Sequence, residues 1–254
     1  MTVHFIGAGP GAADLLTVRA VSLINRSPVC LYAGTYIEDA ILAHCPPQAQ
    51  LIDSQHLDLD QIIEHLAAAD RKGRDVARLC SGDPSLYSAM AEQTRRLDQL
   101  GVAWDVTPGV PAYAAAAAAI GRELTVPDVA QTVILTRAQA ASTKMPETES
   151  LRRLAASKAT LVLHLAIRRT RELANELADS YGAGCPVVVV ANASTPSEQI
   201  LRGTLADIGD AVESAGLRQA AVILVGEALG TGDFLDSHLY GKRFRAGQEL
   251  HRRD

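Results

Sequence analysis

The first half of the chain alternates short apolar runs with stretches in which apolar residues recur every three or four positions. The runs predict strands at 3–7, 28–33, 50–53, 75–80 and 103–107. The helical spacing predicts helices at 15–25, 37–45, 59–72 and 87–100. Because strands and helices alternate, we expect a mainly parallel sheet that is covered by helices on both faces.

The pattern changes around 106–111, where two prolines flank a glycine and an alanine-rich helix follows at 112–120. We interpret this segment as a connection and predict an N-terminal α/β domain at 1–112, a C-terminal α/β domain at 113–245 and a tail at 246–254. The second half predicts a mixed sheet with helical crossovers at 168–181 and 206–215, and a polar, mobile loop at 138–149. Its predicted strands are 131–136, 160–165, 186–191, 200–204 and 220–225.

Composition narrows the function classes. The chain has 254 residues, 48% of them apolar, which is ample for packed cores. Its net charge of −5 and short basic clusters argue against non-specific binding of nucleic acid. The apolar runs are too short to span a membrane and no secretory signal is visible, so we expect a cytoplasmic protein.

The cysteines and histidines give no sign of a metal centre. The four cysteines are widely scattered and contain no Cys-x-x-Cys pair, which is typical of reduced thiols in a cytoplasmic protein. The seven histidines show no ligand-like spacing. The sequence therefore predicts no metal site.

Loops of small and polar residues follow four of the predicted strands. In open α/β sheets, ligands bind beyond the carboxyl ends of the strands, so these loops predict a binding cleft between the domains. Ordinary turns are the alternative interpretation for each loop, and Asp83 in the second loop could simply cap the next helix. The four loops are 7–11, 81–84, 107–112 and 191–196.

The first loop also fits a dinucleotide fingerprint, with Gly7, Gly9 and Ala12 in the required positions. However, Pro10 removes one N–H that would bind phosphate, and no acidic residue follows the second strand until Glu38. Nucleophile-elbow and P-loop motifs are absent from the sequence. A nicotinamide-dependent oxidoreductase and a non-catalytic nucleotide sensor remain alternatives at this point.

Taken together, the loops resemble those of the tetrapyrrole (corrin/porphyrin) methylase family along the whole chain. The resemblance implies two α/β domains, S-adenosylmethionine bound in the cleft between them, a small-molecule tetrapyrrole substrate and a homodimer. The matching segments are Gly7–Gly11 with Leu15–Thr17, Ser81–Pro84, Pro108–Val110, Ser194–Gln199 with Gly203–Leu205, and Val225–Glu227.

A narrower set of segments resembles the branch of the family that methylates C11 of precorrin-4 in cobalamin biosynthesis. Methylation of other ring carbons, of diphthamide precursors or of rRNA ribose is the alternative within the family. The chain departs from the branch at 140–143, where Ala-Ala-Ser-Thr replaces a Gly-Arg pair. The narrower segments are Tyr32–Thr35, Ser81–Tyr87, Glu92–Gln93 with Leu97–Gly101, Glu123–Pro127 and Gln131–Arg137.

The resemblance also implies site residues. Asp83 would either meet the positive charge of the cofactor or fix its own loop, and Leu86 and Leu165 would supply apolar walls. Arginines near the cleft loops would bind substrate carboxylates: Arg122, Arg137 and Arg168. The implied cofactor contacts are Pro10, Ser81, Gly82, Asp83, Leu86, Pro111, Ala112, Leu165, Ala193 and Ala221.

The implied reaction is an in-line transfer of a methyl group from sulfonium sulfur to an electron-rich ring carbon. Such a transfer needs alignment and exclusion of water more than it needs a strong nucleophile. The sequence identifies no proton acceptor.

Overall fold

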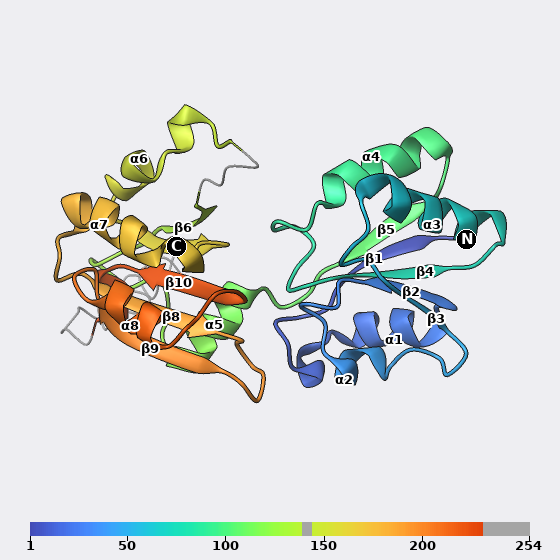
Figure 1. Ribbon diagram of the computed structural model, residues 1–254, viewed down its shortest axis with the longest axis horizontal. Helices are drawn as coiled ribbons and strands as arrows, with labels where there is room; N and C mark the ends of the chain where they lie inside the picture. The colour runs from blue at the N-terminus through green and yellow to red at the C-terminus, as the bar shows by residue number, and fades with distance from the viewer. Residues whose placement is uncertain (139–143, 231–254) are drawn as a thin grey trace, which may run out of the picture. The chain divides into compact units, whose positions relative to one another are not determined.

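The computed structural model describes residues 1–138 and 144–230, which form two compact units (Figure 1). The first unit comprises Met1–Ala119 and the distant segment Asn192–Glu198. The second comprises Ile120–Ala191 and the described residues from Gln199 onward. The boundary that we place after residue 112 stays a prediction. The departure at 140–143 and the tail at 246–254 lie outside the described residues.

The first unit is built on a five-stranded sheet in the order β3-β2-β4-β1-β5, and every neighbouring pair is parallel. The predicted parallel sheet is therefore confirmed. Because all five strands run the same way, their carboxyl ends share one edge. The strands are β1 Val3–Gly7, β2 Val29–Tyr32, β3 Gln50–Asp53, β4 Val76–Cys80 and β5 Trp104–Thr107.

Helices cover both faces of this sheet, with α3 and α4 on one face and α1 and α2 on the other (Figure 1). Alternate residues of β1 serve the two cores: Val3 and Phe5 pack in one buried cluster, and Ile6 packs in the other. β1 is buried along its whole length, as expected for a central parallel strand. The helices are α1 Val18–Arg26, α2 Asp39–Leu42, α3 Leu59–Arg71, α4 Met90–Leu100 and α5 Ala112–Ile120.

Local sequence signals explain two of the helix starts. Thr17 caps α1 by accepting a hydrogen bond from the Ala20 N–H. Asp58 and Gln61 form a capping box at the start of α3. The prediction for α4 was wrong by three residues, because Tyr87 and Ala89 have φ angles of 53° and 54° and cannot belong to a right-handed helix.

The second unit contains a mixed sheet in the order β6-β7-β10-β8-β9, which confirms that prediction. β6 and β7 are parallel, whereas the other neighbouring pairs are antiparallel. The strands are β6 Val133–Arg137, β7 Thr160–His164, β8 Pro186–Ala191, β9 Gln199–Thr204 and β10 Ala221–Val225.

Two helices pack over the core of the second sheet, α7 Thr170–Tyr181 and α8 Ile208–Ser214. Arg171 joins them by ion pairs to Asp210 and Glu213. Gly209 allows this approach, because a Cβ there would lie 3.0 Å from the Arg171 Cβ. The short helix α6, Leu151–Ala155, was not predicted.

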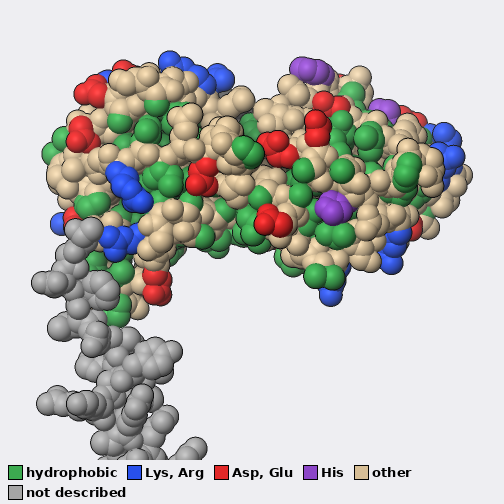
Figure 2. Space-filling view, turned by 90° about the horizontal axis from the view of Figure 1, so that it is seen from below, with side chains coloured by type: hydrophobic (Ala, Val, Ile, Leu, Met, Phe, Trp, Pro, Cys, Tyr) green, Lys and Arg blue, Asp and Glu red, His purple; other side chains and the backbone are tan. Residues whose placement is uncertain are grey.

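The surface carries mixed charge. Figure 2 shows Lys and Arg side chains in separate groups among Asp and Glu side chains on one face of the molecule. Within residues 1–138 and 144–230, every helix is too short or too polar to cross a membrane.

A buried arginine forms hydrogen bonds in the middle of the first sheet. Arg78 on β4 is 7% exposed, and its guanidinium donates to Leu31 O, to Leu79 O and to Gln93 Oε1 on α4. Burial lowers the pKa of Arg78, but an arginine stays charged at neutral pH. Gln93 also donates to Ala89 O, so one buried amide supports both the charge and the start of α4.

Replacement of Gln93 by Leu will remove the acceptor of a buried charged donor. We expect the free energy of unfolding of the first unit to fall by about 2 kcal/mol. The single tryptophan, Trp104, lies on β5 and reports this unfolding in urea by its fluorescence. Gln99→Leu on the exposed face of the same helix is the matched control and should cost less than about 0.5 kcal/mol. Equal losses in the two variants would contradict the role of Gln93.

Candidate functional site

The carboxyl ends of β1, β4 and β5 meet through three glycines. A Cβ on Gly109 would lie 2.3 Å from Gly82 O, and a Cβ on Gly7 would lie 2.4 Å from the Gly109 nitrogen. Real side chains do not fit at such distances, so only glycine allows these backbones to touch. We call the contact of Gly7, Gly82 and Gly109 the glycine junction.

Backbone hydrogen bonds extend the glycine junction into a small ladder beyond the sheet. Gly9 donates to Gly82 O at 3.1 Å, and Gly82 donates to Gly9 O at 2.7 Å. Ala8 donates to Cys80 O at 2.8 Å, which continues the pairing of β1 with β4. The loops at 7–11 and 81–84 are therefore held side by side.

Asp83 fixes the third loop to the second. Its Oδ2 accepts a hydrogen bond from the Gly109 N–H at 2.8 Å. Its Oδ1 accepts from the Ser85 N–H at 2.9 Å and from the Ser85 hydroxyl. The alternative in which Asp83 only caps the next helix is wrong, because α4 begins at Met90 and its N-cap is Ala89.

These contacts keep Asp83 ionised. Partial burial raises the pKa of its carboxyl, but hydrogen bonds from the Ser85 hydroxyl, the Gly109 N–H and the Ser85 N–H lower it more. The net effect places the pKa of Asp83 below its ordinary value. A charged carboxylate is thus built into the wall of the candidate site.

The fourth predicted loop joins the other three, although it is 182 residues away from the first in the sequence. The Ser194 hydroxyl accepts a hydrogen bond from the Ala12 N–H at 3.0 Å. A Cβ on Gly11 would lie 2.4 Å from Thr195 Cγ2, so a third glycine-dependent approach occurs here. Asn192 and Ser194 have φ angles of 49° and 67°. Asparagine tolerates this left-handed region and serine rarely adopts it, so Ser194 marks a tightly specified turn.

The first loop is not arranged to hold a pyrophosphate. The N–H groups of Ala8, Gly9 and Ala12 already donate to protein acceptors, and Pro10 has no N–H. In addition, α1 begins only at Val18, so no helix N-terminus stands directly on the turn as a dinucleotide site requires.

The structure brings most of the predicted cofactor residues together in the first unit. Leu86 belongs to the same turn as Asp83, because its N–H donates to Asp83 O at 3.2 Å. Pro111 and Ala112 lie beside Gly82, whose Cβ would be 3.6 Å from the Pro111 Cα and 3.5 Å from the Ala112 nitrogen. The predicted residues in this unit are Pro10, Ser81, Gly82, Asp83, Leu86, Pro111, Ala112 and Ala193.

The other two predicted cofactor residues lie in the second unit, at one edge of its sheet. Leu165 directly follows β7, and Ala221 begins the antiparallel strand β10. Leu165 is 68% exposed with a φ angle of 54°, a conformation that a leucine rarely adopts. An exposed apolar side chain on such a strained backbone is typical of a functional position.

Two of the predicted arginines lie at this same edge. Arg137 ends β6 as the register partner of His164, and Arg168 follows β7 and donates to Arg218 O at 3.0 Å. Arg122 is not grouped with them. It lies two residues before Leu124, whose carbonyl accepts from Thr160 at the opposite end of β7.

Sequence reasoning missed several groups that build this site. Asp53 at the end of β3 accepts from the Gly34 N–H at 2.9 Å and so holds the loop after β2. The position of Asp53 at a strand end was a usable signal, whereas the contacts of Ser194 were not visible in the sequence. Within the described residues, no group of three or more His, Cys, Asp or Glu side chains is placed to hold a metal ion.

Comparison with known proteins gives consistent matches along the chain. Residues 2–209 match the family model of tetrapyrrole (corrin/porphyrin) methylases. A relative from Rhodococcus erythropolis named precorrin-4 C(11)-methyltransferase is 57% identical over 240 residues, which are 94% of this chain and 96% of the relative.

Two solved structures have folds similar to that of this chain. A cobalt precorrin-4 methyltransferase of cobalamin biosynthesis is 39% identical with a TM-score of 0.87, over 90% of this chain and 96% of that one. Uroporphyrin-III C-methyltransferase from Thermus thermophilus, solved with S-adenosylhomocysteine, is 27% identical with a TM-score of 0.76, over 90% and 93% of the two chains.

Replacement of Gly109 by Ala will force the glycine junction apart. We expect the first unit to lose about 2 kcal/mol of stability from overpacking. We also expect it to bind S-adenosylhomocysteine at least tenfold more weakly in calorimetric titration. Gly184→Ala is the matched control, since a Cβ there meets nothing within 4 Å. Unchanged affinity for S-adenosylhomocysteine in Gly109→Ala would show that the glycine junction does not support the binding site.

Replacement of Asp83 by Asn will weaken the binding of S-adenosylhomocysteine without unfolding the chain. The wild-type carboxyl has a lower pKa in the folded than in the unfolded state, so its stabilisation is fully present above about pH 4. That stabilisation is lost as the pH falls through the folded-state pKa. The stability difference between wild type and variant, followed by Trp104 fluorescence, should therefore shrink in acid. A difference that stays constant or grows in acid would contradict this assignment.

Proposed function

The chain belongs to the tetrapyrrole (corrin/porphyrin) methylase family, and from this membership we propose its reaction and the residues that perform it. It transfers a methyl group from S-adenosylmethionine to C11 of precorrin-4, a step of cobalamin biosynthesis. The observation that carries the assignment is the near-full-length similarity to precorrin-4 C(11)-methyltransferases. The nicotinamide alternative has no support, because the first loop lacks the arrangement that a pyrophosphate requires.

The loops of the first unit fit a cofactor that has no phosphate. The glycine junction leaves a wall of nearly bare backbone, and Asp83 adds one negative charge to it. S-adenosylmethionine supplies a methyl group already activated on a positively charged sulfur. We propose that it contacts the residues implied by the resemblance: Pro10, Ser81, Gly82, Asp83, Leu86, Pro111, Ala112, Leu165, Ala193 and Ala221.

In this proposal the protein acts by positioning. The three strand ends fixed by the glycine junction hold the loops at constant spacing, which favours alignment of the reacting atoms. Asp83 holds the loop at 107–112 through Gly109 and lowers the cost of binding a cation beside it. Leu86 and Leu165 provide apolar surface that excludes water.

Precorrins carry many carboxylates, which require basic groups. We propose Arg137 and Arg168 for this contact, since they lie at one edge of the second sheet. Arg122 is the weaker candidate, because it is not grouped with the other two.

We further propose that the protein is a cytoplasmic homodimer that acts on a small molecule and not on nucleic acid. The four free cysteines are typical of a reducing compartment.

The decisive experiment incubates the protein with S-adenosylmethionine and either precorrin-4 or its cobalt complex. We expect one added methyl group, located at C11 by NMR. Methylation at another ring carbon, or no methylation, would contradict the proposed reaction. Separate titrations with S-adenosylhomocysteine and NAD should show binding of the first only.

A further inference from the structure

Four of the six tyrosines of this chain lie at one edge of the first sheet. The chain has only 6 Tyr, 3 Phe and 1 Trp among 254 residues. Tyr32 ends β2, and Tyr36 lies in the loop that follows it. Tyr87 lies in the loop after β4, and Tyr113 is the second residue of α5, beyond β5. Thus most of the tyrosines stand at the carboxyl edge that carries the candidate site.

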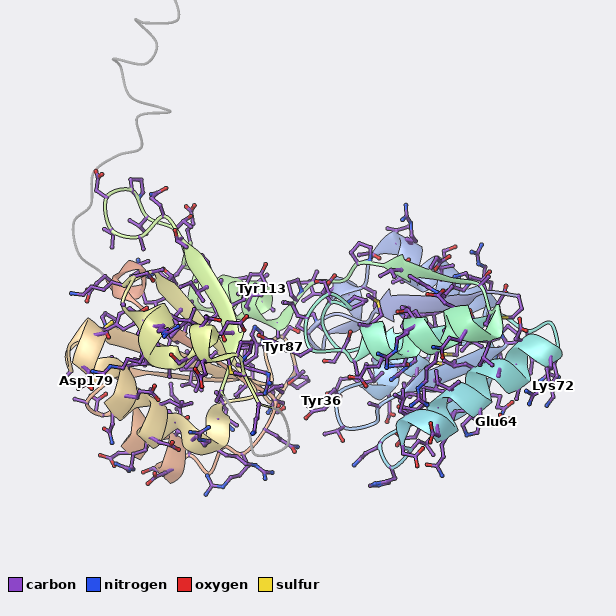
Figure 3. The ribbon with its side chains drawn as sticks, turned by 90° about the horizontal axis from the view of Figure 1, so that it is seen from above. Tyr36, Glu64, Lys72, Tyr87, Tyr113 and Asp179 are labelled. Carbon is purple, nitrogen blue, oxygen red and sulfur yellow. The ribbon has the colours of Figure 1, made fainter. Side chains whose placement is uncertain are left out.

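Two of these tyrosines are exposed residues. Tyr36 is 44% exposed and Tyr87 is 45% exposed, whereas aromatic side chains in a monomer are usually more buried. β2 and β4 are neighbours in the sheet, so the two loops start side by side. Figure 3 shows both tyrosines at the end of the first unit that is opposite to Lys72, the C-cap residue of α3.

Both loops are braced by a carboxylate at a strand end. Asp53 accepts hydrogen bonds from the Gly34 and Gln55 N–H groups at 2.9 Å, and these contacts lower its pKa. The Tyr36 N–H closes the same loop by donating to Ala33 O at 3.1 Å. Asp83 braces the second loop in the way described above. The loops that carry the two tyrosines are therefore held in place by hydrogen bonds.

The backbone at Tyr87 adds a second indication. Its φ angle of 53° is unfavourable for a bulky residue, and such conformations persist where the surrounding structure selects them. A glycine would occupy this position with less strain, yet the sequence places an aromatic residue here. The chain thus keeps a large, flat side chain at a costly backbone conformation beside the site.

We propose that Tyr36 and Tyr87 form an aromatic platform against which one face of the tetrapyrrole macrocycle packs. This inference rests on the proposed function. A macrocycle with a partly conjugated ring system and a charged periphery needs an apolar surface for its face and polar groups for its rim. Tyrosine supplies a rigid apolar ring and a hydroxyl at its tip, so it suits that boundary. The two tyrosines are positioning residues for the acceptor carbon.

The test compares Tyr36→Ala, Tyr87→Ala and the double variant with the wild type. We expect the KM for precorrin-4 to rise about fivefold in each single variant and more in the double variant, while kcat changes less than about twofold. Affinity for S-adenosylhomocysteine should not change. Tyr→Phe at either position should restore most of the KM, because the ring remains. Leu100→Ala, which removes another exposed apolar side chain of the first unit, is the matched control and should have no effect.

A second measurement separates this inference from the proposed function. Uroporphyrin III, a stable tetrapyrrole, is titrated with each variant, and the double variant should bind it about tenfold more weakly than the wild type. If the wild type binds uroporphyrin III through the tyrosines but does not methylate precorrin-4, the proposed function fails and the platform stands. If the wild type methylates precorrin-4 and the double variant keeps its KM, the platform is wrong. Loss of S-adenosylhomocysteine affinity equal to the change in KM would also overturn it, because the tyrosines would then only support the loops.

Discussion

The contact of three backbones at the glycine junction is the constraint on which the rest of the site depends. β1, β4 and β5 are adjacent parallel strands, so their carboxyl ends are close together in any sequence of this fold. Closeness alone leaves room for side chains between the loops. Here a Cβ on Gly109 would lie 2.3 Å from Gly82 O, so the loops touch through backbone atoms only. This contact sets their spacing without relying on flexible side chains.

Charged side chains then hold in place the loops that the glycines bring into contact. Asp83 joins the loop after β4 to the loop after β5, and Asp53 holds the loop after β2. Below them, Arg78 donates to Leu31 O and Leu79 O and ties β2 to β4 inside the sheet. Each of these charges is used first to fix backbone, which is costly to leave unpaired. The outcome is an edge whose loops are positioned before any ligand arrives.

Much of this fold could be predicted from the sequence because the signals are local. The strands at Val3–Gly7, Gln50–Asp53 and Pro186–Ala191 were located to the residue, since apolar runs with clear turn residues on both sides define them. The start of α4 could not be predicted, because the left-handed Tyr87 and Ala89 depend on contacts of the surrounding loop. The hydrogen bond from Ala12 to Ser194 spans 182 residues of sequence, and no local pattern encodes it. The same holds for the Gly109 N–H that donates to Asp83, whose helix-capping alternative was equally compatible with the sequence.

Pro10 shows how the sequence and the structure together decide between two chemistries. In the sequence it was an objection to a phosphate loop, because it removes one N–H from a set that such a loop needs. In the structure three further N–H groups of the turn are also committed: Ala8 donates to Cys80 O at the end of β4, Gly9 donates to Gly82 O, and Ala12 donates to the Ser194 hydroxyl. A turn in which these donors are used within the protein offers a ligand mainly its shape and its bare surface. That is unsuitable for a pyrophosphate and suitable for a cofactor that has no phosphate and carries a positively charged sulfonium. The glycines in this turn therefore serve close contact between backbones, and Pro10 is compatible with the turn because no ligand requires the N–H that it lacks.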